Sequence, residues 1–400
     1  MARSIGTRPW RVRARSAMGN APLAADGMVF GTSTDHHVYA VDAATGRLQW
    51  KHRVADRSPP LVALLRPPRV GHSLGSLHIG MPAAGDRPGA LHTVHSRTGE
   101  TRWRTEIGEA SVFDVLVEGG VVFACCSDGV RTFEAGSGTQ RWHRTVENLP
   151  SVRWGGPASA DGIVACVGEI RQSWSSADAV CVIVAFDLDS GERLWVRSIE
   201  TTGVRLAASP GRLYLATSQG ELIALELRTG EESRVRDDGP NWIFAFPARP
   251  TRTMSTVAMR PGGFTPVLVS HTPVSAALST PVVTSDGVFV GSQNGNTYRA
   301  NVVDGRLSYY TWETDLQVRA VAHGQGLVFA GFIDGMVNAC PAEGGDFHWA
   351  TISPVGRVAG LTCADGMLYV SGDPFLAAFD ATTGAGPWRW PRQRTTTSRR

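Results

Sequence analysis

The 400-residue sequence has almost no lysine, because Lys51 is the only one and the other basic residues are arginines. Mechanisms that need a lysine, such as a Schiff base or a Gly-Lys-Ser/Thr phosphate loop, are therefore poorly supported. The charges nearly balance, with a net charge of +3, and the arginines are scattered singly apart from a tail at 392–400. That distribution argues against a nucleic-acid partner.

Long hydrophobic runs are also missing. Residues 1–16 contain no apolar segment of the kind found in signal peptides, and no window approaches the ~18 apolar residues of a membrane span. The sequence therefore predicts no membrane span and a cytoplasmic location, with export only if the N-terminus is incomplete. The six cysteines lie mostly within apolar stretches, as expected of buried free thiols in a reducing compartment.

The sequence does contain a repeat. The segment VYAVDAATGRLQW at residues 38–50 recurs eight times with variations, and several copies are separated by about 39 residues. A period of this length predicts a repeat architecture rather than separate domains. Each copy keeps a glycine eight residues after its first residue, and these are Gly46, Gly99, Gly138, Gly191, Gly230, Gly305, Gly345 and Gly384.

The columns of the repeat have separate physical roles. An acidic residue such as Asp42 or Asp187 provides an acceptor for the N–H groups of a tight turn, and the glycine four residues later suits a backbone with positive φ. Six copies then carry a tryptophan, which we predict to be a structural plug between neighbouring sheets. These residues are Trp50, Trp103, Trp142, Trp195, Trp349 and Trp388.

A second motif, an Asp-Gly or related turn between short apolar runs, recurs in each unit, as at 25–27, 160–162 and 364–366. Two tight hairpins per unit make four short strands. We therefore predict an all-β, eight-bladed propeller, a monomeric ring over residues 21–390. Residues 1–20 form an N-terminal segment in which 9–12 resembles a ring-closing outer strand, and 391–400 form a basic, flexible tail.

Insertions interrupt the repeat at 80–90, 169–178 and 236–278, the last being either a lid or a decayed blade outside the ring. By the up-and-down order of the strands, the first two fall on the face opposite the glycine turns. We predict that this variable face binds a partner, because arginine and tryptophan are enriched at interface hot spots. The candidate binding residues are Arg87, Arg171, Trp174, Trp242, Arg249 and Arg252.

The segment DAATGRLQW at 42–50, repeated with the Asp-Gly hairpin, resembles the pyrroloquinoline-quinone-like (PQQ-like) propeller repeat family over residues 20–390, except for 236–278. That family includes quinoprotein alcohol dehydrogenases, the propeller lipoprotein of outer-membrane protein assembly, and sensor domains of bacterial serine/threonine kinases. The resemblance implies a bacterial propeller. It leaves two functions open, a binding scaffold and a dehydrogenase, since one fold hosts many activities.

For the dehydrogenase, the resemblance implies a vicinal disulfide over the quinone, and Cys125 and Cys126 are the adjacent pair in this chain. PQQ and calcium would be its cofactors. However, no catalytic residue or metal-ligand set can be placed by motif, so we expect none. The sequence therefore favours a non-catalytic PQQ-like scaffold for a protein or peptide partner, without a cofactor. A PQQ-dependent dehydrogenase, or a quinone-binding remnant of one, is the alternative.

Overall fold

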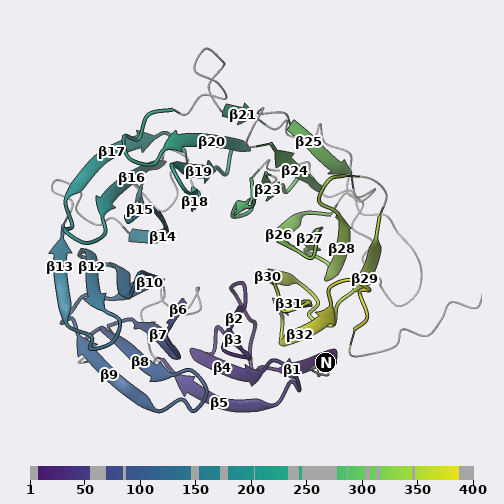
Figure 1. The fold of residues 1–400 in the computed structure, drawn as a ribbon, viewed down its shortest axis with the longest axis horizontal. Helices are drawn as coiled ribbons and strands as arrows, with labels where there is room; N and C mark the ends of the chain where they lie inside the picture. Colours follow the sequence, from purple (N-terminus) through teal and green to yellow (C-terminus); the bar gives the residue numbers. More distant parts are fainter. Residues whose placement is uncertain are drawn as a thin grey trace, which may run out of the picture.

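The computed structural model describes residues 8–54, 69–83, 87–145, 153–171, 179–201, 203–232, 243–245, 277–285, 287–301, 307–311, 316–344 and 347–386. These residues form eight four-stranded antiparallel sheets, which stand as blades around a central axis (Figure 1). The predicted eight-bladed, all-β propeller is therefore confirmed. In this part of the chain there is no helix of the length and hydropathy needed to cross a bilayer.

Each blade runs from an inner strand at the axis to an outer strand at the rim. Blades 1 to 4 consist of β2 (Leu23–Ala25), β3 (Met28–Thr32), β4 (His37–Asp42) and β5 (Leu48–Arg53); β6 (Val70–Ser73), β7 (Ser76–Met81), β8 (Ala90–His95) and β9 (Thr101–Glu106); β10 (Val112–Glu118), β11 (Val121–Cys126), β12 (Gly129–Glu134) and β13 (Gln140–Arg144); and β14 (Arg153–Ala160), β15 (Ile163–Arg171), β16 (Ala179–Asp187) and β17 (Arg193–Ile199).

Blades 5 to 8 have the same order, except that the last takes its outer strand from the N-terminus. They consist of β18 (Arg205–Ser209), β19 (Arg212–Ala216), β20 (Glu221–Glu226) and β21 (Ile243–Ala245); β22 (Val282–Val283), β23 (Val288–Gly291), β24 (Asn296–Ala300) and β25 (Leu307–Thr311); β26 (Val318–Gly324), β27 (Leu327–Phe332), β28 (Met336–Pro341) and β29 (Trp349–Ile352); and β30 (Val358–Ala364), β31 (Met367–Gly372), β32 (Phe375–Asp380) and β1 (Trp10–Arg13).

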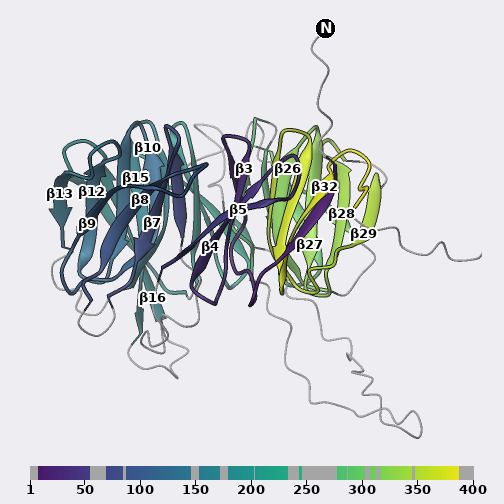
Figure 2. The same cartoon turned by 90° about the horizontal axis from the view of Figure 1, so that it is seen from below.

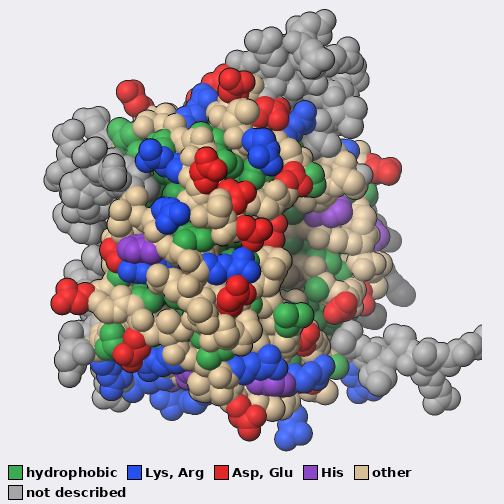
Figure 3. Space-filling model, turned by 60° about the vertical axis from the view of Figure 1, so that its left-hand side comes forward, with side chains coloured by type: hydrophobic (Ala, Val, Ile, Leu, Met, Phe, Trp, Pro, Cys, Tyr) green, Lys and Arg blue, Asp and Glu red, His purple; other side chains and the backbone are tan. Residues whose placement is uncertain are grey.

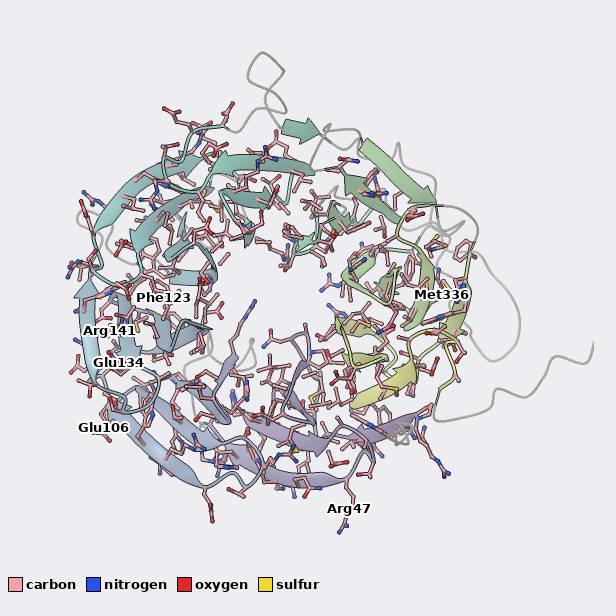
Figure 4. The ribbon with its side chains drawn as sticks, in the orientation of Figure 1. Arg47, Glu106, Phe123, Glu134, Arg141 and Met336 are labelled. Atoms are coloured by element: carbon pink, nitrogen blue, oxygen red, sulfur yellow. The ribbon has the colours of Figure 1, made fainter. Side chains whose placement is uncertain are left out.

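Burial follows the position of a strand within its blade. The second strands β11, β27 and β31 are buried along their whole length, whereas the outer strand β9 alternates between exposed and partly buried residues. Both faces of a middle strand meet a neighbouring sheet, so its residues are apolar without alternation, and the outer strand has one side in solvent. The core is accordingly a series of apolar layers between blades, such as the cluster around Phe123 (Figure 4), which also contains Phe186.

The inner hairpins use the backbone geometry that Asp-Gly turns favour. Asp26 and Gly27 have φ of 54° and 71°, and Asp161 and Gly162 have φ of 52° and 70°. Two successive residues with positive φ are typical of the two-residue turn that matches the twist of a β-hairpin. These turns join first and second strands at the same face of the disc.

The outer hairpins are held by the acidic column of the repeat. The Asp42 Oδ1 atom accepts hydrogen bonds from the Thr45 N–H at 2.9 Å and from the Thr45 hydroxyl at 2.6 Å, and the Gly46 N–H donates to the Asp42 carbonyl at 2.9 Å. The Asp380 Oδ1 atom accepts the Thr383 N–H in the same way at 2.7 Å. The acidic residue and the glycine therefore close one turn together.

The N-terminal segment joins the last blade to the first. β1 pairs antiparallel with β32, and the pairing of Trp10 with Ala378 repeats the pairing of Trp50 with Ala40 in blade 1. The chain then crosses to β2, and the Ser371 hydroxyl donates to the Asn20 carbonyl at 2.5 Å along the way. Strands from the two ends of the sequence thus complete one sheet.

Part of the stretch predicted to lie outside the ring belongs to it. β21, which comes from the interval 236–278, pairs with β20 as the outer strand of blade 5. The remaining predicted excursion lies outside the described residues except for 277–278, where Leu278 is buried against blades 5 and 6. The repeat spacing could not show this, because the fourth strand of blade 5 comes after extra residues.

Two faces of the disc can now be defined, with the strands crossing between them (Figure 2). The turn face carries the tight hairpins between first and second strands and between third and fourth strands. The loop face carries the connections between second and third strands, such as 33–36 and 333–335, and those between blades, such as 14–22 and 353–357. Of the insertion at 80–90, the described residues 82–83 and 87–89 connect β7 to β8 and belong to the loop face, where β15 also ends at Arg171.

On the side of the molecule that Figure 3 shows, basic and acidic side chains are interspersed, with only small hydrophobic areas between them. Leu48 is 44% exposed and Val196 is 46% exposed, but they lie on the outer strands of different blades. Isolated exposed hydrophobic residues of this kind are normal on soluble surfaces and mark no interface.

Candidate functional site

The tryptophans of the outer strands make one repeated contact between blades. The indole N–H of Trp142 in β13 donates to the Leu188 carbonyl of the next blade at 3.0 Å, and its ring lies over Gly191. Each such tryptophan bonds to the carbonyl three residues before the repeat glycine of the following blade. The described tryptophans in this position are Trp10, Trp50, Trp103, Trp142, Trp195 and Trp349, with donor–acceptor distances of 2.7–3.0 Å.

The repeat glycines are needed for this contact as well as for the turn. A Cβ added to Gly191 would lie 2.6 Å from the Trp142 ring, and one added to Gly138 would lie 2.4 Å from the Trp103 ring. Both distances are too short for carbon atoms. From the sequence we explained these glycines only by positive φ, since the partner ring belongs to a different copy of the repeat.

The tryptophan predicted for the last blade is a separate case. Trp388 lies outside the described residues. In blade 8 the corresponding position is held by Trp10, whose ring covers Gly46 of blade 1 and whose indole N–H bonds to the Ala43 carbonyl. The contact between blades 8 and 1 is thus made by a residue from the N-terminal strand.

The adjacent cysteines do not form the structure that the quinoprotein resemblance implies. Cys125 and Cys126 are free thiols at the end of β11, and both are fully buried. They point to opposite sides of the strand, because Cys125 belongs to the apolar layer with Cys166 and Cys126 to the layer with Val112. Burial raises the pKa of Cys126 to about 12 and raises that of Cys125 well above its usual range.

These thiols therefore fit neither a bridge over a quinone nor a reactive nucleophile, since a thiolate is disfavoured at both positions. Neither residue lines the central channel. Among the described residues, no group of three or more His, Cys, Asp or Glu side chains could hold a metal ion.

The hollow that can receive a ligand lies on the axis of the ring. Two adjoining spaces, of about 530 and 680 Å³, share Asn20, Asp114 and Arg319 among their walls. The smaller one is lined by residues from or next to all eight inner strands, so it is the central channel. Its walls include edge strands, because each inner strand has a sheet neighbour on one side only (Figure 1).

The channel opens on the loop face. The larger space is lined by the connection from β1 to β2 at 17–20, by Gly203 and Val204 before β18, and by Asp373 between β31 and β32. All of these belong to the loop-face connections defined above. Side chains extend from the inner strands into the middle of the ring (Figure 4). We call this opening the channel mouth.

Among the residues whose side chains are described, four arginines surround the channel mouth. They stand within two residues of the start of an inner strand in blades 2, 5, 7 and 8, and they are Arg69, Arg205, Arg319 and Arg357. The carboxylates lining the same space are Asp114, Glu169 and Asp373. The smaller, deeper space has three of the arginines and only one carboxylate, Asp114. The channel mouth is therefore polar and more basic with depth.

Asp114 lies close enough to one of these arginines to balance its positive charge. Its side chain is 7% exposed, its Oδ2 atom lies 3.4 Å from Arg69 Nε, and it accepts the Gly156 N–H at 2.9 Å. A buried carboxylate with such partners is a fixed part of the wall. Asp114 thus ties blades 2, 3 and 4 together beside the channel.

Sequence analysis did not select these arginines. The signal was present, since an arginine stands at or next to the first residue of several inner strands, but it is outside the repeat pattern and does not align between copies. Only closure of the ring brings residues separated by hundreds of positions, such as Arg69 and Arg357, around one space.

The predicted partner-binding residues are not assembled into one described site. Arg87 is exposed in the connection from β7 to β8 on the loop face. Arg171 is the last residue of β15, also at the loop face, and its side chain lies outside the described structure. The remaining four, Trp174, Trp242, Arg249 and Arg252, lie outside the described residues. The assignment of these six residues to an interface remains a prediction.

The segment Gly71–Gly75 has the Gly-x-Ser-x-Gly spacing of a nucleophile elbow. From the sequence we took this motif to be absent, which was wrong. Here Ser73 ends β6 in a hairpin rather than a strand-to-helix turn. Its hydroxyl lies 2.9 Å from His78 Nε2, but His78 Nδ1 lies 2.7 Å from the Thr93 hydroxyl and not from a carboxylate. Burial lowers the pKa of His78 to about 4. The arrangement is a buried hydrogen-bond chain within blade 2.

Comparison with known sequences agrees with this architecture. Residues 3–71, 65–172 and 175–236, together more than half of the chain, match the family described as outer membrane protein assembly factor BamB. The chain is 28% identical over 204 residues to the outer membrane protein assembly factor BamB of Burkholderia pseudomallei, covering 48% of this chain and 47% of that protein. It is 30% identical over 145 residues to the serine/threonine-protein kinase AfsK of Streptomyces coelicolor, covering 36% of this chain and 16% of the kinase.

Solved structures show the same fold at low sequence identity. BamB from Moraxella catarrhalis aligns with a TM-score of 0.57 at 18% identity, over 92% of this chain and 98% of that one. The quinohemoprotein alcohol dehydrogenase ADHIIG from Pseudomonas putida aligns with a TM-score of 0.59 at 15% identity, over 96% of this chain and 78% of the enzyme. At such identities the likeness concerns the fold alone.

Proposed function

The chain belongs to the family described as outer membrane protein assembly factor BamB, and from that premise we propose that it is a non-catalytic propeller scaffold whose loop face receives a protein or peptide partner. The two curated relatives are named as an assembly factor and a kinase, and the chain spans less than half the length of each. Their activities as whole proteins are therefore not transferred, and the shared element is the propeller.

The observation that carries this proposal is the channel mouth. Its two spaces adjoin on the loop face and are bordered by Asn20, Thr280 and Gln293 as well as by charged side chains. The eight inner strands also present their free edges to the channel, and an exposed strand edge can pair with an extended chain. A concave, polar surface with strand edges suits a peptide segment better than a flat interface.

The test compares partners captured by the two faces. A photoactivatable cross-linking residue replaces Arg171 on the loop face in one variant and Arg47, in the outer-hairpin turn of blade 1, in another. Arg47 is an exposed side chain on the turn face (Figure 4). We expect a discrete adduct from the first variant in cells and none from the second. Adducts formed only through Arg47 would show that the binding face is the opposite one.

The interface residues are tested in the same assay. Arg171→Ala combined with Trp174→Ala should reduce recovery of the cross-linked partner, while Arg47→Ala should not, provided that each variant keeps its melting temperature. Unchanged recovery from the loop variant would remove these two residues from the proposed interface.

The quinone-dependent alternative has a direct check. Purified protein is incubated with PQQ and calcium, freed of unbound quinone, and measured for a retained chromophore and alcohol-dependent dye reduction. Since the Cys125 and Cys126 thiols are buried on opposite sides of their strand, we expect neither signal. Both signals together would replace the scaffold proposal by an enzymatic one.

A further inference from the structure

Two arginines at the channel mouth, Arg319 and Arg357, have no ion-pair or hydrogen-bond partner for their side chains among the described residues. Arg319 lies in β26 and Arg357 directly precedes β30, so they come from the adjacent blades 7 and 8. Arg69, in contrast, lies beside Asp114, and Arg205 donates to the Leu278 carbonyl at 2.9 Å.

The positive charges of Arg319 and Arg357 also interact with each other. Partial burial, and then the charge of Arg357, lower the pKa of Arg319 from its usual range. Two positive groups held near each other on adjacent blades repel, and this repulsion is relieved when an anion binds between them. The ring closure that brings blades 7 and 8 together therefore creates a place for negative charge.

The chemistry of the two side chains limits the ligand. A guanidinium presents a planar fork of N–H donors that matches a carboxylate or phosphate in bidentate fashion. Both spaces at the channel mouth include Arg319, and the larger one also includes Arg357. An anion that enters the larger space from the loop face therefore reaches both guanidinium groups.

The form of the wall favours a peptide over a small anion. The adjoining spaces of about 530 and 680 Å³ each have the size of a small-molecule pocket, and together they extend beyond one. They are bordered by the edges of inner strands, whose backbone groups can bond to an extended chain. A free phosphate or carboxylate would contact only the arginine side chains and not the strand edges.

We propose that the channel mouth binds an acidic, extended peptide segment of a partner protein, whose Asp or Glu carboxylates pair with Arg319 and Arg357. This inference deepens the proposed scaffold function and rests on it, because it states the chemistry of the segment that the loop face receives. Arg205 and the polar residues of the mouth contact the same segment farther along.

The test measures binding of defined peptides to the full chain. A fluorescein-labelled peptide of alternating Glu and Ser is titrated in fluorescence anisotropy beside the same peptide with Gln in place of Glu. We expect the Glu peptide to bind at least about tenfold more tightly than the Gln peptide, with affinity falling as salt rises. The combined variant Arg319→Gln, Arg357→Gln should lose at least about tenfold in affinity for the Glu peptide.

Arg47→Gln is the matched control, since it removes one exposed arginine from the turn face and should leave the affinity unchanged. Circular dichroism and the melting temperature verify the fold of each variant, and the single variant Arg357→Gln, at an exposed position, serves if the double variant does not fold. Equal binding of the Glu and Gln peptides, or equal affinity of the double variant and the Arg47 control, would overturn the inference.

Inorganic phosphate is the competitor that separates the sources of negative charge. If phosphate alone displaces the Glu peptide at a concentration below that of the peptide itself, the site is a phosphate site and the peptide proposal fails. The result is independent of the cross-linking experiment. Loss of peptide binding with intact loop-face adducts removes only this inference, while peptide binding without adducts removes the wider scaffold role.

Discussion

At the outer rim one contact is made again and again: a tryptophan of one blade covers a glycine of the next and donates to the carbonyl three residues before it. At the channel mouth no contact between described residues repeats in this way, and the arginines that line it come from four of the eight blades. The rim contact holds neighbouring blades at one spacing, and it is made by six tryptophans among the described residues. The channel mouth can vary between blades because the ring does not depend on it for closure.

The rim and the channel mouth thus separate the residues that stabilise the ring from those available to bind a ligand. Residues that follow the repeat, such as Trp142 and Gly191, satisfy each other across a blade boundary. Residues that depart from it, such as Arg319 and Arg357, leave charge without a partner among the described residues. We therefore expect the binding residues of this ring to be at positions that are not shared between copies of the repeat.

The largest expected effect comes from removing a rim contact. Trp142 is 6% exposed, contacts Phe123 and Phe186, and donates to the Leu188 carbonyl. Trp142→Ala should therefore destabilise the fold by about 3–5 kcal/mol. Urea and thermal unfolding followed by circular dichroism measure the loss. Full stability of this variant would show that the rim tryptophans are not what holds the blades together.

The second prediction separates the two roles of the repeat glycine within blade 4. Gly191 and Gly162 have φ of 69° and 70°, but only Gly191 lies against a tryptophan, whereas a Cβ at Gly162 would meet nothing within 4 Å. Gly162→Ala should cost about 1–2 kcal/mol through backbone strain alone. Gly191→Ala should cost about 2–4 kcal/mol, because overpacking is added to the strain.

A double-mutant cycle checks this reasoning. In a Trp142→Ala background, Gly191→Ala should cost no more than Gly162→Ala, since the ring that the new methyl group would meet is gone. An undiminished cost in that background would assign the whole effect to φ.

The third prediction concerns blades 1 and 2, where a histidine pair departs from the apolar pattern. His52 Nε2 lies 3.0 Å from His92 Nδ1, and burial, followed by the charges of His52 and Arg104, lowers the pKa of His92 to about 4. Because the folded pKa lies below the ordinary value of 6.5, the unfolded chain binds the proton more readily. The stabilising effect of neutral His92 is complete above pH 6.5 and declines as the pH falls toward 4.

We expect about 1–2 kcal/mol of stability to be lost at pH 5 through this residue. His92→Gln should flatten that part of the stability profile, measured as melting temperature between pH 7.5 and pH 4.5. His95→Gln, at the end of the same strand, is the control. An identical profile for both variants would contradict the assignment.

The smallest effect should come from a rim contact that is electrostatic rather than packed. Arg141 lies 2.5 Å from Glu134 within blade 3 and 2.9 Å from Asp189 of blade 4, at the surface (Figure 4). Exposed ion pairs contribute little, so Arg141→Gln should change stability by about 0.5 kcal/mol or less. The measurement is the urea midpoint at low and high salt. A loss comparable to that of Trp142→Ala would show that charge, and not packing, joins the blades.

The structure of a single blade could be predicted from the sequence. The acidic residue, the glycine and the tryptophan lie within one copy of the repeat, and the turn they form is local, as the bonds from Thr45 to Asp42 show. Eight copies and two hairpins per copy then sufficed to predict an eight-bladed all-β ring. Local chemistry could be read from the pattern because each turn satisfies its own backbone groups.

The contacts between different copies of the repeat became visible only in the tertiary structure. That Gly191 must be small because of Trp142, and that β21 supplies the edge of blade 5 from beyond the expected repeat, depends on contacts between residues far apart in the chain. The same holds for the channel mouth, where Arg319 and Arg357 face one space only once the ring has closed. The repeat in the sequence predicts the structure of each blade. The charged residues that do not repeat come together only because the blades are arranged in a closed ring.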